Sequence, residues 1–499
     1  MSVLSVVVFL PAAVAAALLA LPRVGPAVTR WVWVAATAVE VALVGWLWAD
    51  FAPGANGFAH EVEHRWIPSV DSGYHLGVDG VSLPLVAMTS VLFLACAVHS
   101  LRHTDRVRTF AVLFLLLETV SVGLFVSLDL ILFFVFFDLS IVLMYFVIAG
   151  WGHRGAARAA QLFFLYTFLG SLALLLGFLG LYVAAEPHTF DIVRLTEQNP
   201  LAGRSTFGAL VLLAILLGLA VKTPAVPVHT WLPPAHTEAP SAGSAILAGV
   251  LLKMGTYGFV RIAMPVLPDA WRAFAPAIVV LGVLSVLYGA LVALGQGDFK
   301  RMVAYTSVNH MGYILLAVGA AGLLATDREQ AHTLAVTGAV TQMVAHGLIT
   351  GSLFLLSGVL HDRGHSYRMD AYGGLAAHTP RFAGLTALAV FASLGLPGFA
   401  GFIAEFQIFT GALVAVPVAV GFAVLGILLT AALFVRAYQR LFLGRPRRAD
   451  GPAPHDLTAV EAGSIVPLMA LAVLIGVFPR PLLDVIEPAA RALGPLLGR

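Results

Sequence analysis

Apolar residues are gathered along this chain in runs of about 20 residues or longer, without the alternation of polar and apolar positions that barrel strands show. In hydrocarbon every backbone N–H and C=O must be satisfied within the protein, and runs of this length achieve that as helices. The pattern therefore predicts an all-α, polytopic membrane protein. Windows of about 19 residues predict about fourteen transmembrane helices, at residues 2–21, 28–49, 80–100, 108–127, 129–150, 161–184, 207–223, 239–263, 271–294, 301–322, 331–360, 382–413, 417–441 and 459–479.

Composition indicates that lipid covers most of this apolar surface. Of the 499 residues, 60% are hydrophobic and 11% are charged, and the mean hydropathy is +0.94, which is too much apolar surface for an ordinary globular core. Residues 2–21 lack the basic residues that open a secretory signal, so we expect a retained span, although their alanine-rich end resembles a cleavage site. The net charge of +2 gives no indication of a nucleic-acid partner.

Positive charge is distributed unevenly between the predicted loops. Lysine and arginine are more frequent after odd-numbered spans than after even-numbered ones. By the positive-inside rule, the odd-numbered loops are cytoplasmic and both termini lie on the outer side. In this interpretation Lys300, at the edge of the tenth span, is one of the cytoplasmic loop charges.

Proline and glycine interrupt two predicted spans, the seventh at residues 222–227 and the twelfth at residues 395–398. Broken helices occur at membrane depth where the freed backbone is buried in protein or lines a polar cavity, as at the binding sites of transporters. The breaks lie five spans apart, and an odd displacement inverts the second unit, so we expect two inverted five-helix repeats. The expected division is residues 1–105 (spans one to three), 106–265 (first repeat, spans four to eight), 266–445 (second repeat, spans nine to thirteen) and 446–499 (last span and C-terminal tail).

Lysine is rare in this chain and is concentrated inside the membrane. The sequence holds 25 arginines but three lysines, and Lys222 and Lys253 lie within apolar spans. A desolvated ammonium can release its proton, whereas a guanidinium cannot, so a site that gains and loses protons needs lysine. Because an ion at the bilayer centre costs about 2.5–3.5 kcal/mol, such residues usually persist for function. The alternative is that these lysines form structural ion pairs between helices.

Four acidic residues lie within predicted spans: Asp138 in the fifth, Glu405 after the break in the twelfth, Glu118 in the fourth and Glu40 in the second. A carboxylate beside a lysine keeps the lysine charged, and its protonation or withdrawal lets the lysine release a proton. We therefore expect Asp138 and Glu405 to transfer protons, and Glu118 is a further candidate. Glu40 is expected to be a satisfied polar contact or a contact with another subunit.

Histidines can connect such sites, because imidazole titrates near neutral pH and relays protons through two nitrogens. His310 and His346 lie within spans, and His229 and His236 flank the break in the seventh span. A lone buried histidine is more often a hydrogen-bonded core residue, but four of them in or beside the charged spans favour a relay. The pattern favours His310 and His346 most.

Three further histidines, His60, His64 and His75, lie among acidic residues in the loop after the second span. A metal site is one interpretation, but the spacing is not that of compact metal ligands. We expect a solvated loop and no metal. The single cysteine, Cys96, lies inside an apolar run and leaves no disulfide or iron–sulfur ligation, so we expect no cofactor in this chain and redox chemistry elsewhere.

Five segments of the chain resemble the motifs of one known family. They are LGVDGVSLPL (residues 76–85), VKTPAVPVHTWLPPAHTEAPS (221–241), LKMGTYG (252–258), DFKRMVAYTSVNHMG (298–312) and ASLGLPGFAGFIAEF (392–406). The family comprises the antiporter-like subunits of the proton-pumping NADH:quinone oxidoreductase, respiratory complex I. The resemblance covers about residues 70–445.

The resemblance implies roles for most of the buried polar residues. Lys222 matches the seventh-span lysine of the family, which pairs with a fifth-span acid, here Asp138. Lys253 matches the eighth-span lysine that passes the proton onward, and His310 and His346 match relay histidines.

At two positions the comparison with the family pattern is informative. Glu405 matches the terminal twelfth-span residue, which is acidic in one branch and usually lysine in the sister branches and in related sodium/proton antiporters. Asp138 stands where the family nearly always has glutamate, and the shorter side chain retracts the carboxylate by about 1.5 Å. That distance is enough to exchange a direct lysine contact for a water-mediated one.

Together the residues and the resemblance predict a proton-translocating membrane-arm subunit of NADH:quinone oxidoreductase in a bacterial cell (plasma) membrane. NADH, FMN, iron–sulfur clusters and quinone are expected in partner subunits, with antiporter-like subunits on either side of this chain in the lipid bilayer. The alternatives are a subunit of a sodium/proton antiporter, a subunit of a membrane-bound hydrogenase-type complex, and a scaffold that has lost transport.

Overall fold

The computed structural model describes residues 2–21, 23–54, 57–324, 328–446 and 454–497. These residues form an almost entirely helical protein, and every predicted span corresponds to a helix or to a broken pair of helices. The helices at the predicted spans are α1 (Val3–Ala20), α2 (Pro26–Asp50), α3 (Ser82–His99), α4 (Val107–Val126), α5 (Leu130–Trp151), α6 (Ala156–Ala184), α8 (Ser205–Lys222), α10 to α12 (Ser241–Val266), α13 (Pro268–Leu294), α14 (Phe299–Leu323), α15 (Glu329–Gly364), α16 (Pro380–Ser393), α17 (Ala400–Leu413), α18 (Pro417–Phe442) and α19 (Ala459–Val477).

Within the described ranges, twelve helices are long and apolar enough to cross a membrane. The tenth and twelfth predicted spans are not among them. α14 has sufficient length, but it carries several polar side chains and is almost entirely buried by protein. The twelfth span is divided into α16 and α17, each of 14 residues. The predicted fold class, an all-α polytopic membrane protein, is confirmed.

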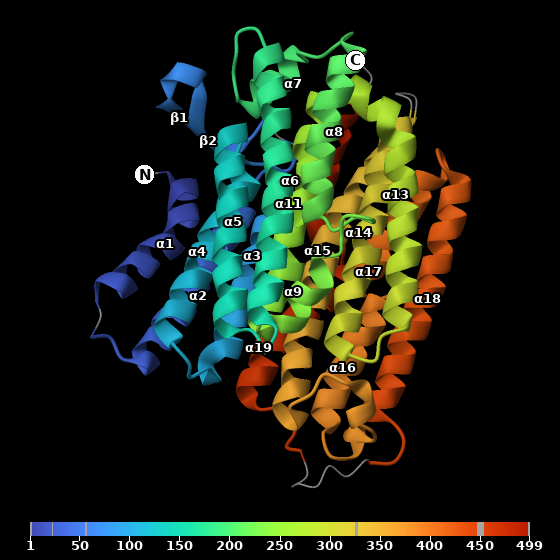
Figure 1. The fold of residues 1–499 in the computed structure, drawn as a ribbon. Helices are drawn as coiled ribbons and strands as arrows, with labels where there is room; N and C mark the ends of the chain where they lie inside the picture. Colours follow the sequence, from blue (N-terminus) through green and yellow to red (C-terminus); the bar gives the residue numbers. More distant parts are fainter. Residues whose placement is uncertain (1, 22, 55–56, 325–327, 447–453, 498–499) are drawn as a thin grey trace.

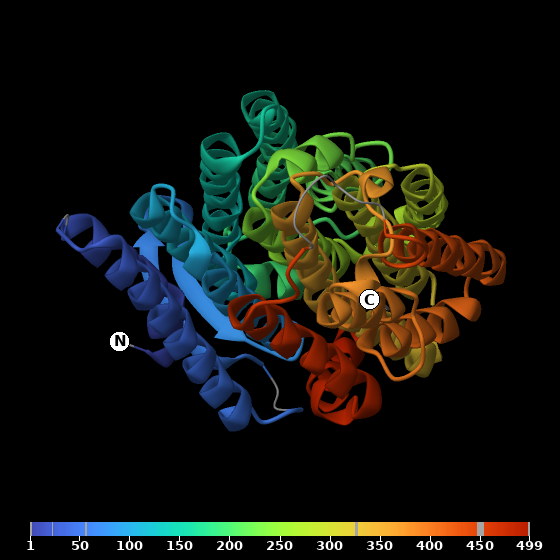
Figure 2. The ribbon, with the colours of Figure 1, turned by 90° about the horizontal axis from the view of Figure 1, so that it is seen from below.

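The long helices run roughly side by side in one bundle (Figure 1), and α1 and α2 lie along one edge when the bundle is seen from below (Figure 2). Small residues allow the closest helix contacts, as is usual in membranes. A Cβ atom on Gly282 of α13 would lie 2.6 Å from the backbone nitrogen of Leu316 in α14, and one on Gly289 would lie 2.6 Å from that of Asn309. α13 and α14 therefore pack backbone to backbone, which fixes α14 in the middle of the protein.

The predicted break in the seventh span is confirmed. α8 ends at Lys222, and the chain resumes as a short helix, α9 (Leu232–Glu238). Pro224 and Pro227 lack the N–H groups that would continue the ladder. The indole N–H of Trp231 donates to the carbonyl of Val221 at 2.9 Å, so a backbone group freed by the break is satisfied inside the protein.

The predicted break in the twelfth span is also confirmed. α16 ends at Ser393 and α17 begins at Ala400. Between them Gly395 and Gly398 have φ values of +66° and +96°, which L side chains rarely adopt. The break turns the chain so that Glu405, on the second turn of α17, faces the interior.

Three features were not predicted from the sequence: a β-hairpin, the short helix α7 (Ile192–Gln198) and the C-terminal helix α20 (Arg480–Leu497). The hairpin consists of antiparallel strands β1 (Ala59–Ile67) and β2 (Ser72–Val78). All three lie at the end of the bundle that carries the loops after even-numbered spans (Figure 1).

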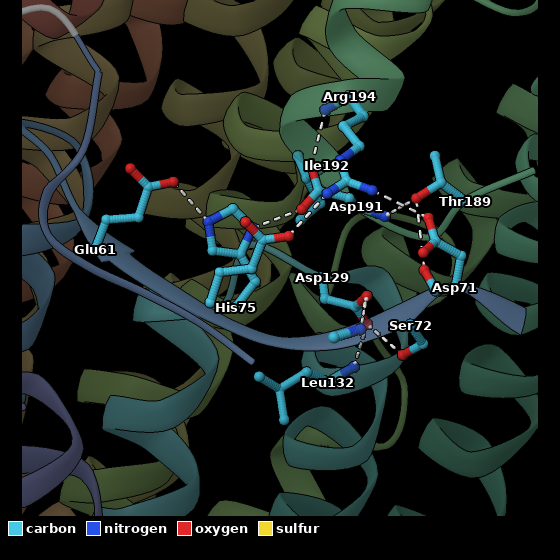
Figure 3. A network of polar contacts seen from close by, with 12 residues as sticks. Glu61, Asp71, Ser72, His75, Asp129, Leu132, Thr189, Asp191, Ile192 and Arg194 are labelled. Carbon is cyan, nitrogen blue, oxygen red and sulfur yellow. Dashed lines mark hydrogen bonds and ion pairs between the residues drawn. The ribbon is translucent and has the colours of Figure 1, made fainter. Parts of the chain in front are cut away.

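A polar network attaches the hairpin to the bundle (Figure 3). His75 is 4% exposed, and its ring nitrogens lie 2.5 Å from Asp191 and 2.7 Å from Glu61. Asp129, the N-cap of α5, accepts hydrogen bonds from Ser72 and from the backbone N–H of Gly73. The expectation of a solvated loop is therefore wrong for His75, because its principal partner lies 116 residues away in sequence.

Candidate functional site

Lys253 lies at the centre of the buried polar groups. It belongs to α11 (Leu252–Gly258), between π-helical segments at Leu247–Leu251 and Phe259–Ala263. π-helical turns disturb the regular backbone ladder and are frequent at functional sites. The Lys253 ammonium donates to the carbonyl of Ala248 at 2.5 Å and lies 2.6 Å from Nδ1 of His346 in α15. The proton of a hydrogen bond between an amine and an imidazole can transfer from one nitrogen to the other, so this buried pair can exchange one proton.

The polar contacts continue from His346 to α14 and α17. The rings of His346 and His310 lie 5.4 Å apart between centroids, and the amide of Gln342 lies 3.2 Å from Nδ1 of His310. A cavity of about 10 Å³ lies between these side chains and Glu405. This volume admits roughly one water molecule. The structure therefore brings together four of the predicted residues, Lys253, His346, His310 and Glu405.

Lys222 forms a second buried centre about the break in the seventh span. Its ammonium donates to the Ser140 hydroxyl at 2.8 Å and lies 4.6 Å from the centre of the Phe137 ring. Asp138, between these two residues on α5, is partly exposed, and one of its oxygens has no hydrogen-bond partner in the described part of the chain. Lys222 and Asp138 influence each other electrostatically but form no direct ion pair.

The ion pairs of the described residues use arginine or histidine, and none of them uses lysine. The buried or nearly buried ones are His75 with Asp191 at 2.5 Å, Arg261 with Asp79 at 2.5 Å and Arg363 with Glu461 at 2.6 and 2.7 Å. The structural lysine ion pairs that were the alternative interpretation are therefore absent from this part of the chain.

Lys300, which the sequence analysis counted among the charges of the loops and span edges, does lie at the edge of a span, but it is buried there. It is fully buried in the first turn of α14, where its ammonium donates to the carbonyl of Ala239 and lies 3.4 Å from the Tyr367 hydroxyl. Its neighbours Asp298 and Arg301 made the segment look like a solvated span edge. The available signal was composition, because Lys300 is the third lysine in a chain that otherwise uses arginine.

The remaining candidates lie away from the central group. Glu118 of α4 and Glu40 of α2 are fully buried, and none of their four carboxylate oxygens has a hydrogen-bond partner among the described residues. Glu40 is therefore not the satisfied intramolecular contact that was one expectation. His229 is buried beside Tyr288, with 5.0 Å between ring centroids, and does not belong to the series of contacts that joins Lys253 to Glu405.

The arrangement allows proton transfer between Lys253 and Glu405. Lys253, the two histidines and Glu405 belong to α11, α15, α14 and α17, so a change in the packing of any of these helices would alter the separation of donor and acceptor. Side chains that can each hold or release a proton, at hydrogen-bond distance or separated by one water, form a relay. Within the described residues no group of side chains is arranged to hold a metal ion.

Comparisons with known proteins identify the family of the chain. A family model described as NADH:quinone oxidoreductase/Mrp antiporter, TM, matches residues 127–430. The NADH-quinone oxidoreductase subunit M of Rhodobacter capsulatus is 38% identical over 507 residues, covering 99% of this chain and 96% of that protein.

Solved structures show the same fold over the whole length. A chain of respiratory complex I from Thermus thermophilus with bound NADH has a TM-score of 0.89 and 30% identity, and the match covers 99% of this chain and 100% of that chain. A chain of the Mrp complex from Dietzia sp. DQ12-45-1b matches with a TM-score of 0.84 and 23% identity, covering 100% of both chains, and so shares the fold. The chain therefore belongs to the NADH:quinone oxidoreductase/Mrp antiporter family of membrane proteins.

Proposed function

We propose that this chain is the M-type, proton-translocating membrane-arm subunit of an NADH:quinone oxidoreductase. The observation that carries the proposal is the buried series Lys253, His346, His310 and Glu405, which joins titratable groups of four helices by direct contact or through a one-water cavity. Such groups are costly within a membrane and mark ion and proton pathways. The acid at position 405 and the 38% identity to a subunit M both favour the complex I branch over the Mrp antiporters.

In this proposal each lysine has a distinct role. Lys222 and Asp138 form the switchable site of the first repeat (residues 106–265), and Lys253 passes the proton toward the second repeat (residues 266–445). Glu405 is the terminal group. Glu118 and His229 are accessory candidates, since they lie outside the central series. Residues 1–105 and 446–499 flank the two repeats.

The proposal assigns the redox chemistry to other subunits. NADH, flavin, iron–sulfur clusters and quinone are bound by partner subunits, and this chain contacts further antiporter-like subunits on either side in a bacterial plasma membrane. The odd-numbered loops face the cytoplasm and both termini face outward, as the excess of arginine and lysine in those loops indicates.

Three variants of the assembled complex in vesicles test the proposal. Lys222→Met and Glu405→Gln are each expected to abolish proton pumping while assembly stays measurable, because each removes a group that must exchange a proton. Lys222→Arg is the matched control, since it keeps the positive charge but cannot release a proton. Pumping is measured as protons translocated per NADH oxidised.

The arginine variant separates two explanations of a lysine effect. If Lys222→Arg pumps normally and Lys222→Met does not, the residue acts as a fixed charge and the relay role is refuted. Full pumping in both Lys222→Met and Glu405→Gln would contradict the assigned function altogether.

A further inference from the structure

We propose that His153 and Tyr367 form the route by which protons from the aqueous phase reach the buried ammonium of Lys300, at the end of the bundle that carries the odd-numbered loops. This inference rests on the proposed function and deepens it, because it names the groups that feed the central relay. The residues come from three separate odd-numbered loops or span edges, after the fifth, ninth and eleventh spans.

Exposure decreases steadily along this route. His153, between α5 and α6, is exposed, Tyr367 is 9% exposed and Lys300 is fully buried. Nε2 of His153 lies 3.0 Å from the Tyr367 hydroxyl, which lies 3.4 Å from the Lys300 ammonium. The three side chains therefore form a continuous hydrogen-bonded path from the surface to a buried amine.

Neighbouring rings hold the tyrosine in place. The ring of His361 stacks on that of Tyr367, with centroids 4.6 Å apart, and also contacts the ring of His153 at 5.0 Å. The Lys300 ammonium lies 4.8 Å from the centre of the Tyr367 ring. This packing involves the ring faces and leaves the hydroxyl in contact with both the imidazole and the amine.

The route continues inward through the second half of the broken seventh span. Lys300 donates to the carbonyl of Ala239, directly after α9, and the backbone carbonyl of Glu238 accepts from the N–H of His153 at 2.9 Å. His236, on the same short helix, is fully buried, and neither ring nitrogen has a partner among the described residues. The charges of both Lys300 and Lys253 act electrostatically on His236. The proposed route assigns the step between Lys300 and the central relay to His236, whose two ring nitrogens are free to accept and donate.

The transfer balances without any further reactant. A protonated His153 donates its Nε2 proton to the Tyr367 oxygen while the phenol donates its own proton to a neutral Lys300 amine. The products are a neutral imidazole, an unchanged phenol and an ammonium. Burial raises the pKa of Tyr367, so the phenol stays neutral and acts only as a bridge. Burial and the charges of Lys300 and His361 lower the pKa of His153 to about 4, so its protonated form is sparsely populated at neutral pH.

Several further charged and titratable groups lie near the path. Those that face it are Glu238, Asp298, His361, Asp362, His365 and Tyr372. The negative charges of the carboxylates stabilise protonated groups near the surface. His361 provides a second imidazole beside Tyr367. Loss of His153 alone is therefore expected to have a smaller effect than loss of the Tyr367 hydroxyl.

The test uses the assembled complex in vesicles whose odd-loop end faces the added buffer. Tyr367→Phe keeps the stacked ring and removes the bridging hydroxyl, and it is expected to lower the rate of proton translocation by about tenfold. His153→Gln is expected to lower it about threefold, with recovery on addition of imidazole, a mobile proton carrier. Tyr372→Phe is the matched control, because the Tyr372 hydroxyl donates to the backbone carbonyls of Ser366 and Leu360 and lies outside the route.

Failure of this proton route and failure of the proposed function would give different results. Normal translocation in Tyr367→Phe, an equal loss in Tyr372→Phe, or a loss in His153→Gln that imidazole does not reverse would each overturn the route. Lys222→Met is measured in the same preparation. If it blocks pumping while Tyr367→Phe pumps normally, the route is wrong and the proposed function stands, whereas normal pumping in both variants contradicts both.

Discussion

At the scale of single residues, the choice between lysine and arginine follows what each cation must do. Arg261 and Arg363 make short, fixed ion pairs with carboxylates, and guanidinium suits this role because it stays charged and matches two oxygens at once. The three lysines instead contact a hydroxyl, a carbonyl or an imidazole. An ammonium without a carboxylate partner is the cation most easily deprotonated by a change in its surroundings.

Gly395 makes room for Glu405, which leads to a prediction for a single methyl group. A Cβ at this position would lie 2.1 Å from Oε2 of Glu405, and φ is +66°. Gly395→Ala is therefore expected to displace the carboxylate from the cavity that it shares with His310 and to reduce proton pumping at least about tenfold. Pumping by the reconstituted complex, normalised to assembled protein, measures this effect.

Gly398→Ala provides the matched control for that prediction. Gly398 has a φ of +96°, but no heavy atom lies within 4 Å of a Cβ placed there. It reports the cost of backbone strain alone, which is about 1–2 kcal/mol. If both variants lose pumping to the same extent, strain in the break accounts for the effect and the displacement of Glu405 does not.

The sequence predicted most of the central site because each of its members is polar in an apolar run. Lys253, His346, His310 and Glu405 stand out in this way and the structure brings them together. Lys300 does not stand out, because its immediate neighbours are charged. Its contacts come from residues 61 and 67 positions away, which local pattern cannot show.

At the scale of elements, hydropathy locates spans well because lipid imposes one requirement on all of them. α18 was expected at residues 417–441 and runs from Pro417 to Phe442. The hairpin lies in the connection between α2 and α3, and its first strand, AHEVEHRWI, offers no apolar run. It is stabilised by contacts with α5 and with the segment before α7. The β-propensity of individual residues does not include such tertiary contacts and so could not predict the hairpin.

The hairpin anchor is expected to depend on pH through His75. Burial opposes the charged imidazole, but hydrogen bonds to Asp191 and Glu61 outweigh burial and raise the pKa of His75. A raised pKa means that the stabilisation is complete below the unfolded value of about 6.5 and is lost as pH rises through the folded value. The pKa of Asp191 is lowered against the effect of burial, mainly by its bond to His75, so stability is also lost at acidic pH, below about 4.

Hydrogen exchange of residues 59–78, corrected for intrinsic rates, measures this dependence. Protection is expected to be greatest between about pH 4 and 6.5 and to fall toward alkaline pH. His75→Gln should remove the alkaline dependence, whereas His64→Gln should keep it, because His64 is exposed and only stacks on Tyr74. Identical profiles for both variants would mean that the ion pair does not hold the hairpin.

At the scale of the whole molecule, the two ends of the bundle differ in construction. One end carries the hairpin, α7 and α20, and the other carries the loops that contain His153 and Tyr367 (Figure 1). A vectorial pump needs such a difference, because uptake and release of protons must occur on opposite sides. The direction of the relay therefore depends on which end faces the cytoplasm, and the excess of arginine near the second end predicts that it does.

The cysteine content of the chain allows a direct measurement of this orientation. Cys96 is the only cysteine in the sequence and is fully buried, so the unmodified protein should resist a membrane-impermeant maleimide. Ser69→Cys, at the exposed turn of the hairpin, is expected to react in cells whose outer envelope is permeabilised and whose plasma membrane is intact. Thr104→Cys, in the exposed loop between α3 and α4, should react only after the plasma membrane is opened. The reverse pattern would place the odd-numbered loops outside and would make the path through Tyr367 an exit for protons.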